Sequence, residues 1–265
     1  MKAFLATSVF LFSSMVSAHN IETDQCDVDL DLGIEITKKH IEFSDNKQPV
    51  YKIIDNEILL VNDKQVSLTA SQQALVKQYS KEIRAVVPQV KDIAVEAVDL
   101  AAEGIGIAFT ELLGENNGLT DELVAELDAI KVEIETRFNE GERLYIDDNG
   151  IEGDVFDPEF EQRIEKAVET TVEQSIGKIM IALGTQMIAS GGDSEAFETR
   201  MEKFGEQIEK DMEARAEIIE QKADQLCISV KKIDALESEM LDAIPELNNQ
   251  DVFKVEYKGS KKKMM

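Results

Sequence analysis

The chain has few of the side chains on which many catalytic and metal sites depend. Its 265 residues include two cysteines and two histidines. With no third histidine, and with no spare thiol if the cysteines pair, the ligands for a zinc site are too few. The motifs G-x-S-x-G, G-x-G-x-x-G and the P-loop do not occur in the sequence. We therefore expect no catalytic residues, no cofactor and no metal.

Basic residues are also scarce. The chain has 28 lysines and arginines against 54 acidic residues, a formal net charge of −26. Such a chain repels nucleic acid and anionic lipid headgroups, so we expect neither as a partner. The acidic residues are spread along every expected helix, which favours a solvated surface over a docking surface for cationic partners. Residues 258–265, KGSKKKMM, form a basic cluster that we expect to be a disordered tail.

The N-terminal apolar run is too short to span a bilayer readily. Lys2 precedes an apolar stretch at residues 3–16, and small residues follow at positions 17 and 18. This order predicts a signal peptide, residues 1–18, cleaved after Ala18 so that His19 begins the exported chain. The alternative is an uncleaved membrane anchor. After cleavage we expect no membrane insertion.

The two cysteines, Cys26 and Cys227, form an even pair. In an oxidising compartment such a pair predicts one disulfide. Closing a loop of about 200 residues would stabilise the fold by at most about 5 kcal/mol in a chain-entropy account. Two free buried thiols are the alternative.

Residues 19–69 have the pattern of a β-rich segment. Residues 26–36, CDVDLDLGIEI, alternate apolar and acidic side chains, HIEFS predicts a second strand, and residues 50–61 predict two more. The pairs Asp55-Asn56 and Asn62-Asp63 suit hairpin turns. We predict a small antiparallel meander. Residues 247–265 contain a possible further strand at residues 251–257, which can join the sheet, and end in the basic tail.

Residues 70–246 predict four long helices with apolar residues at steps of three and four. Thr69 or Ser71 suits the first N-cap, and we expect a kink or break at Pro88. The second helix begins near Thr120 and the third near Asp157, and the fourth extends from residue 194 to about 244 over roughly 70 Å. The fold class is therefore α+β, a small sheet packed on a bundle of four long helices.

The segment YIDDNGIEGDVFDPEFE, residues 145–161, resembles a calcium loop at first sight. An EF-hand needs oxygen ligands at loop positions 1, 3, 5 and 12 and glycine at position 6. A loop starting at Asp148 has Gly150 at position 3, and one starting at Asp147 has Ile151 at position 5. Neither frame fits, so we predict a short turn or hairpin at residues 145–156, with Asn149-Gly150 at its tip.

Two apolar segments, residues 101–114 and 175–192, contain glycines within expected helices. Small residues let helices approach closely, so we expect the segments to pack against each other in the bundle core. The alternative is a groove for a lipid tail or for an exposed client segment. The candidate binding seam consists of Gly104, Ile105, Phe109, Ile176, Met180, Leu183 and Met187.

Several of these features occur together in a known family. Cys26 opens a strand-rich segment, residues 62–90 read NDKQVSLTASQQALVKQYSKEIRAVVPQV, and a single cysteine lies in the last helix. This order resembles the YggN-like family of Gram-negative periplasmic proteins of unknown function. The likeness is strongest from Cys26 to Val90, weakens through the middle and returns around Cys227. The resemblance implies a periplasmic location and supports the Cys26–Cys227 pairing, but it assigns no activity.

Taken together, these patterns predict a non-enzymatic periplasmic protein with a binding or envelope-maintenance role, of which a chaperone-like role is one form. The expected partner is a protein or an apolar ligand, and self-association is left open. A carrier of an apolar ligand or lipid is the first alternative, and an uncharacterised hydrolase is the second. An enclosed apolar pocket would favour a ligand, an exposed apolar patch would favour client binding, and a buried carboxylate pair in a cleft would favour an enzyme.

Overall fold

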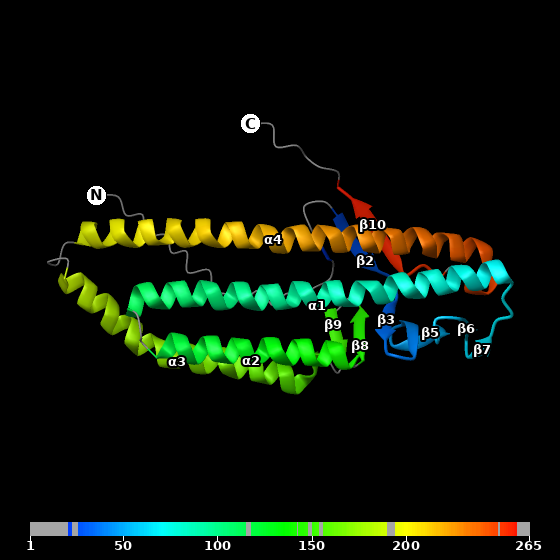
Figure 1. The fold of residues 1–265 in the computed structure, drawn as a ribbon, viewed down its shortest axis with the longest axis horizontal. Coiled ribbons are helices and arrows are strands. Elements are labelled where there is room, and N and C mark those ends of the chain that lie inside the picture. The colour runs from blue at the N-terminus through cyan, green and yellow to red at the C-terminus, as the bar shows by residue number, and fades with distance from the viewer. Residues whose placement is uncertain are drawn as a thin grey trace.

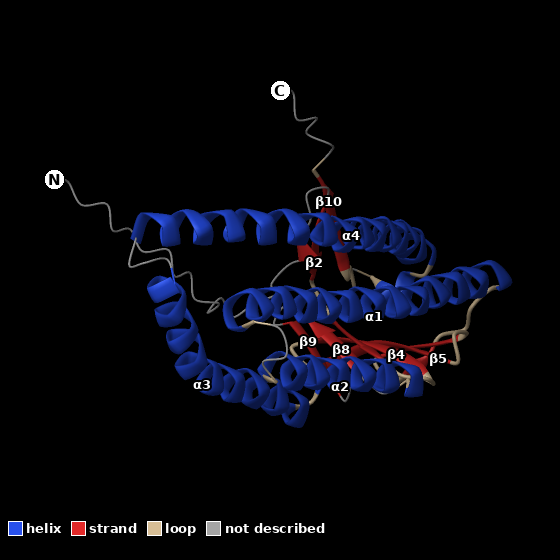
Figure 2. Ribbon diagram, turned by 60° about the vertical axis from the view of Figure 1, so that its left-hand side comes forward, coloured by secondary structure: helices blue, strands red, loops and turns tan. Residues whose placement is uncertain are grey.

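Long helices and two antiparallel sheets make up the chain in the computed structural model (Figures 1 and 2). It describes residues 21–22, 26–114, 118–141, 143–147, 150–153, 156–189, 194–248 and 250–258. The predicted signal peptide, residues 1–18, and residues 259–265 of the basic tail lie outside these ranges. The α+β class is confirmed, with the sheets packed against long helices.

The larger sheet contains the predicted meander. Its strand order is β7-β6-β5-β4-β3-β8-β9, and every pair is antiparallel. The strands are β3 (Gly33–Ile36), β4 (His40–Asp45), β5 (Gln48–Ile54), β6 (Ile58–Val61), β7 (Lys64–Gln65), β8 (Leu144–Asp147) and β9 (Gly150–Gly153). The hairpin predicted around Asn149-Gly150 is confirmed as β8–β9. Its pairing with β3, far away in sequence, was not predicted, because no local pattern specifies it.

Tight turns connect several of the meander strands. Asp55 and Asn56 have φ of 50° and 62°, and Asn62 and Asp63 have φ of 49° and 59°. Positive φ at both central positions is the geometry of the tight hairpin turn, which Asn and Asp tolerate. The pair Asn46 and Lys47 adopts the same conformation at 48° and 64°. Sequence analysis did not single out that third turn, since lysine is not a turn-forming residue.

The smaller sheet brings the two ends of the described chain together. Its order is β1-β2-β10, with β1 (Ile21–Glu22), β2 (Cys26–Leu30) and β10 (Phe253–Tyr257). The predicted C-terminal strand is confirmed, and it pairs with β2, whose residues belong to the first strand of the predicted meander. Residues 26–36 are not one continuous strand. A bend at Asp31 and Leu32 separates β2 from β3 and directs the two strands into different sheets.

The four predicted helices are present as α1 (Ala70–Leu113), α2 (Leu119–Glu140), α3 (Pro158–Ala189) and α4 (Ser194–Ala243), and a short 3-10 turn, η2 (Pro245–Leu247), follows. Thr69 caps α1 in a capping box with Gln72. Of the kink or break expected at Pro88, the break is wrong, because α1 continues through this residue for a further 25 residues, and the kink stays a prediction. Neighbours such as Val86 and Val90 pack against the core, and this packing offsets the hydrogen bond that proline cannot donate.

The helices differ in how they contact the rest of the molecule. Helices α1 and α4 lie side by side, and α2 lies along α1 (Figure 1). Helix α3 leads from beside α2 to the far end of α4 (Figure 2). The largest fully buried side chains belong to the strands and to the parts of α1, α2 and α4 near them, namely Tyr51, Tyr79, Phe43, Ile41, Ile53, Leu59, Ile130, Leu144, Ile233, Met240 and Ile244. The core therefore lies where the sheets meet the helices.

A disulfide joins the smaller sheet to the longest helix. Cys26 on β2 is bonded to Cys227 on α4, which lies 201 residues later in the sequence. Both cysteines are buried, at 0% and 1% exposed. The predicted pairing is confirmed, and the bond fixes β2 against α4.

Replacing either cysteine should destabilise the protein to a similar extent, because each change removes the same bond. Cys26→Ser and Cys227→Ser should each lower the free energy of unfolding by about 2–5 kcal/mol. Urea unfolding of the two variants, beside the oxidised and the reduced wild type, measures this effect. If both variants match the oxidised wild type, the bond does not contribute to stability as we expect.

Candidate functional site

An apolar cavity lies between α1, α4 and strands of both sheets. Its volume is about 280 Å³. The lining consists of Val28, Leu30, Ile34, Ile36, Ile83, Val86, Val90, Ile93, Ile146, Asp147, Gly150, Ile151, Ala223, Leu226, Val230, Ile233 and Phe253. Asp147 at the β8–β9 hairpin is the one charged residue in this set. The cavity therefore offers an almost entirely aliphatic surface.

The lining follows from the periodicity of the elements around it. Helix α1 contributes positions 83, 86, 90 and 93, and α4 contributes positions 223, 226, 230 and 233. Both sets have the alternating steps of three and four that place side chains on one helix face. In a two-helix coiled coil such faces interdigitate and leave little space. Here residues of β2, β3 and β8 border the same space, so the two helix faces do not fill it.

The size and chemistry of the cavity suit a small apolar group. Engineered cavities of 150 Å³ lined by aliphatic and aromatic side chains stay dry and bind benzene. This cavity has nearly twice that volume, which corresponds to an apolar group of roughly ten carbon atoms. Moving such a group out of water is favoured by about 25 cal/mol for each Å² of apolar surface buried.

A buried carboxylate lies beside the cavity. Glu237 on α4 is 0% exposed. Its Oε1 accepts a hydrogen bond of 2.8 Å from the hydroxyl of Tyr79 on α1. Its Oε2 accepts the backbone N–H groups of Val252 at 3.1 Å and Phe253 at 3.0 Å. Glu237 therefore links α1 and α4 to the start of β10.

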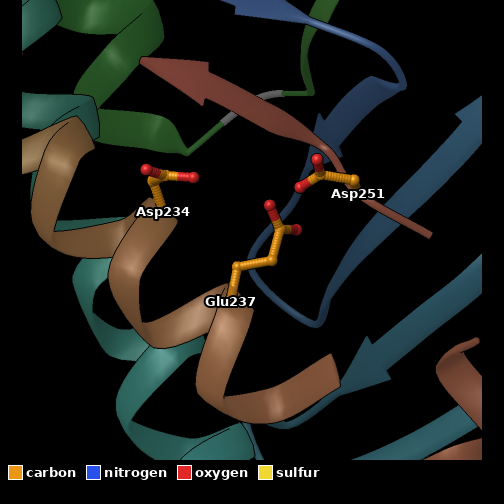
Figure 3. A group of neighbouring side chains, drawn as sticks. All are labelled: Asp234, Glu237 and Asp251. Carbon is orange, nitrogen blue, oxygen red and sulfur yellow. The ribbon is translucent and has the colours of Figure 1, made fainter. Parts of the chain in front are cut away.

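Two further carboxylates converge on Glu237. Asp234, one turn earlier on α4, and Asp251, just before β10, each place an oxygen so that the three ligand atoms lie within 4.8 Å of one another (Figure 3). We call Asp234, Glu237 and Asp251 the carboxylate cluster. Among the described residues, this cluster is the arrangement whose oxygens could hold a cation. Because Glu237 already accepts three hydrogen bonds within the protein, a structural role explains its position.

The surroundings of Glu237 favour its neutral form. Burial raises its pKa from 4.5 to about 7, and the charge of Asp251 adds to the effect. The hydrogen bonds from Phe253, Tyr79 and Val252 lower it, but by less. Burial and then Asp251 likewise raise the pKa of Asp234.

Sequence analysis did not single out Glu237. We expected the acidic residues along the helices to form a solvated surface, and for Glu237 that expectation is wrong. A sequence pattern could have found it, because Val230, Ile233 and Met240 form a buried stripe on α4 in which position 237 is the next member. An acidic residue at such a position predicts burial with hydrogen-bond partners.

The candidate seam residues do not form one surface. On α1, Gly104, Ile105 and Phe109 are half-buried, and a Cβ built on Gly104 would lie 3.1 Å from Sδ of Met212 on α4. On α3, Ile176 and Met180 are 54% and 69% exposed, so their expected packing in the bundle core is wrong.

Ile176 and Met180 are exposed because α3 diverges from α1 toward the far end of α4 (Figure 2). The side chains of Leu183 and Met187 lie outside the described residues. The exposed alternative for the seam stays a prediction.

Asp157, in the acidic segment before α3, caps the start of that helix. Asp157 accepts the backbone N–H of Phe160 at 2.7 Å and pairs with Arg137 on α2 at 2.7 Å. These hydrogen bonds hold the pKa of Asp157 below its usual value. The N-cap predicted at Asp157 is therefore confirmed. Residues 148–149 and 154–155 lie outside the described ranges, so a calcium loop is not tested.

Glu237 should make the stability of the protein depend on pH. Its folded pKa of about 7 exceeds the ordinary value of 4.5, so the folded state binds the proton more tightly. The resulting stability is fully present below pH 4.5 and is lost as pH rises through about 7, by at most roughly 3 kcal/mol. Glu237→Gln should therefore gain stability relative to wild type between pH 5 and pH 8.

Urea unfolding at both pH values measures that difference. Glu239→Gln is the matched control, because Glu239 is exposed two residues later on α4. If the difference in unfolding free energy between wild type and Glu237→Gln is the same at pH 5 and pH 8, the prediction is wrong.

Comparison with known proteins gives the family. Within the part of the chain that the structure describes, no helix is long and apolar enough to cross a membrane. The disulfide is consistent with export. Neither the curated proteins nor the solved structures include a significant match to this chain. A family model described as a protein of unknown function matches residues 26–253, from the first residue of β2 to the first of β10. The chain therefore belongs to the DUF2884 family of proteins of unknown function.

Proposed function

We propose that this protein binds a small apolar ligand in the cavity between α1 and α4 and has no enzymatic activity. The observation behind the proposal is the cavity of about 280 Å³ with its almost entirely aliphatic lining. Ligand sites are typically concave, apolar and supplied with few polar groups. A volume that suits roughly ten carbons indicates a single alkyl or acyl chain as the bound part.

The charge around the cavity narrows the ligand class further. Asp147 is the charged residue of the lining, and the chain as a whole carries a net charge of −26. A free carboxylate on the ligand would be repelled at that rim, whereas a hydroxyl, an ester or an amine would not. We therefore expect a neutral or cationic end group on the apolar chain.

The absence of enzymatic activity is part of the proposal. Glu237 has the raised pKa that a general acid or base often shows. It is nevertheless fully buried, does not line the cavity, and has its oxygens occupied by Tyr79, Val252 and Phe253. A ligand in the cavity would not contact it. The raised pKa of Glu237 therefore does not carry the hydrolase alternative.

The periplasm is the proposed location. The predicted signal peptide, the resemblance to a periplasmic family and the Cys26–Cys227 bond all support export. Acyl chains are abundant in the envelope around that compartment. A carrier of such chains would serve envelope maintenance.

A chaperone-like role is the second candidate. Helix α3 exposes several large apolar side chains, and exposed apolar surface marks interaction sites. They are Ile176, Met180, Ile181 and Ile188, between 54% and 80% exposed. Client segments would bind there, away from the cavity. Ligand binding should therefore depend on the residues that line the cavity, and client binding on the exposed residues of α3.

Filling the cavity should abolish ligand binding. Ala223→Phe adds a ring to a half-buried position of the lining, and we expect it to weaken binding of 1-decanol at least tenfold. Calorimetric titration, or displacement of the fluorescent probe N-phenyl-1-naphthylamine, measures the affinity. The matched control is Ala216→Phe, two turns earlier on α4, half-buried and outside the lining. Unchanged decanol affinity in Ala223→Phe would contradict the proposal.

The second candidate has its own variant. The double change Met180→Asp and Ile181→Asp replaces exposed apolar side chains and should leave decanol binding unchanged. If the wild type suppresses aggregation of an unfolded client and this variant does not, α3 is the functional surface. If both suppress aggregation equally, α3 is not that surface.

A further inference from the structure

A second pocket lies where α1 meets the end of α2 and the strands β3 and β8. Its volume is about 170 Å³, and most of its wall is apolar, formed by Ile36, Val87, Pro88, Phe138 and Leu144. We call it the arginine pocket, because Arg84 of α1 also lines it. It shares only Ile36 with the cavity between α1 and α4. What this pocket binds is therefore independent of the function proposed above.

The charges in the arginine pocket have the opposite sign to those of the protein as a whole. The charged residues in its lining are two cations, Lys38 and Arg84, although acidic residues outnumber basic ones by 54 to 28 in the chain. Nearby lysines such as Lys52 and Lys77 form salt bridges with glutamates. Within the described part of the chain, neither Lys38 nor Arg84 forms a salt bridge. The pocket thus has positive charge that no ion pair neutralises.

The guanidinium of Arg84 is held in place and still has donors to spare. Its Nε donates to Oδ1 of Asn56 at 2.7 Å, and its Nη1 donates to the backbone oxygen of Thr37 at 2.5 Å. Its Nη2 is buried and has no acceptor among the described residues. A guanidinium has five N–H donors, so about three remain, on Nη1 and Nη2. Paired N–H groups of a guanidinium bind the two oxygens of a carboxylate in parallel.

An anion would satisfy what the surrounding residues leave unmet. A buried donor without an acceptor is costly, most of all on a charged group. Burial lowers the pKa of Arg84, and the charge of Asp55 opposes this effect only in part. A bound carboxylate would supply both the missing acceptor and the missing negative charge.

Lys38 is the movable part of the site. Because Nη2 of Arg84 is covered, a side chain must move before an anion can reach it. Lys38 is exposed, and its stem lies at the end of α2, where a Cβ built on Gly141 would be 2.7 Å from its Cε. A lysine ammonium on a flexible stem can move aside to admit an anion and then pair with it.

We propose that the arginine pocket binds the carboxylate of a small organic acid whose apolar body is about the size of a benzene ring. Arg84 holds the carboxylate through parallel hydrogen bonds, Lys38 adds a second positive charge, and the apolar wall contacts the body of the ligand. An engineered apolar cavity of 150 Å³ binds benzene, and this pocket is of similar size. Inorganic phosphate would leave the apolar wall uncovered, so it fits less well.

Calorimetric titration of the full-length protein with benzoate at pH 7 tests the proposal. Benzyl alcohol is the neutral comparison, because it has the same ring and no charge. We expect benzoate to bind at least tenfold more tightly than benzyl alcohol and than inorganic phosphate. Equal affinity for benzoate and benzyl alcohol would overturn the role of the cations, and equal affinity for phosphate would overturn the choice of an organic acid.

Variants of the two cations assign the binding to this pocket. Arg84→Lys keeps the charge but loses the paired donors, so benzoate should bind at least tenfold more weakly. Lys38→Met keeps an unbranched stem at an exposed position, and it should weaken benzoate binding at least threefold and leave benzyl alcohol unaffected. Lys39→Met is the matched control, since Lys39 is exposed and outside the lining, and it should bind benzoate as wild type does.

Methyl NMR locates the bound benzoate. Resonances of Val87 and Leu144 should shift on titration, while that of Val230 in the other cavity should not. If Arg84→Lys does not fold, Lys38→Met and these shifts still decide the question. Wild-type affinity in Lys38→Met, or shifts at Val230 and none at Val87, would overturn the inference.

Discussion

The attachment of β2 to α4 through Cys26 and Cys227 is the constraint on which the rest of this structure depends. Strand β2 is the central strand of the smaller sheet, so fixing it also fixes β1 and β10. The same strand continues through a bend at Asp31 and Leu32 into β3, the strand that pairs with both the meander and the β8–β9 hairpin. One covalent contact therefore holds both sheets against α4, together with the buried core between the strands and the helices. The cavity lies between the strands held at that position and the helices α1 and α4.

Glu237 provides a second contact, which consists of hydrogen bonds and not of a covalent bond. A buried carboxylate is costly, and the three hydrogen bonds that it accepts recover part of that cost. Its position between Tyr79 and Phe253 joins segments that are distant in sequence. The neighbouring Asp251 increases the cost of its charge. An apolar side chain there could not accept the N–H groups of Val252 and Phe253, so the carboxylate is explained by the defined position that it gives to the start of β10.

Local patterns predicted local structure well. The alternation in residues 26–32, the turns at Asp55-Asn56 and Asn62-Asp63, and the caps at Thr69 and Asp157 all depend on neighbours in sequence, and all are confirmed. The pairing of β3 with β8 depends on which distant segments meet, so the sequence alone could not specify it.

The candidate site was less predictable for a related reason. The stripes on α1 and α4 were visible, but whether they interdigitate or leave a cavity depends on the strands between them. The exposure of Ile176 and Met180 depends in the same way on the course of α3.

The most direct test of ligand binding in the cavity is methyl NMR of the protein titrated with 1-decanol. Methyl resonances of Val90, Ile93 and Val230 should shift, while those of Ile176 and Ile181 should not. Shifts confined to α3, or no shifts at all, would contradict the account.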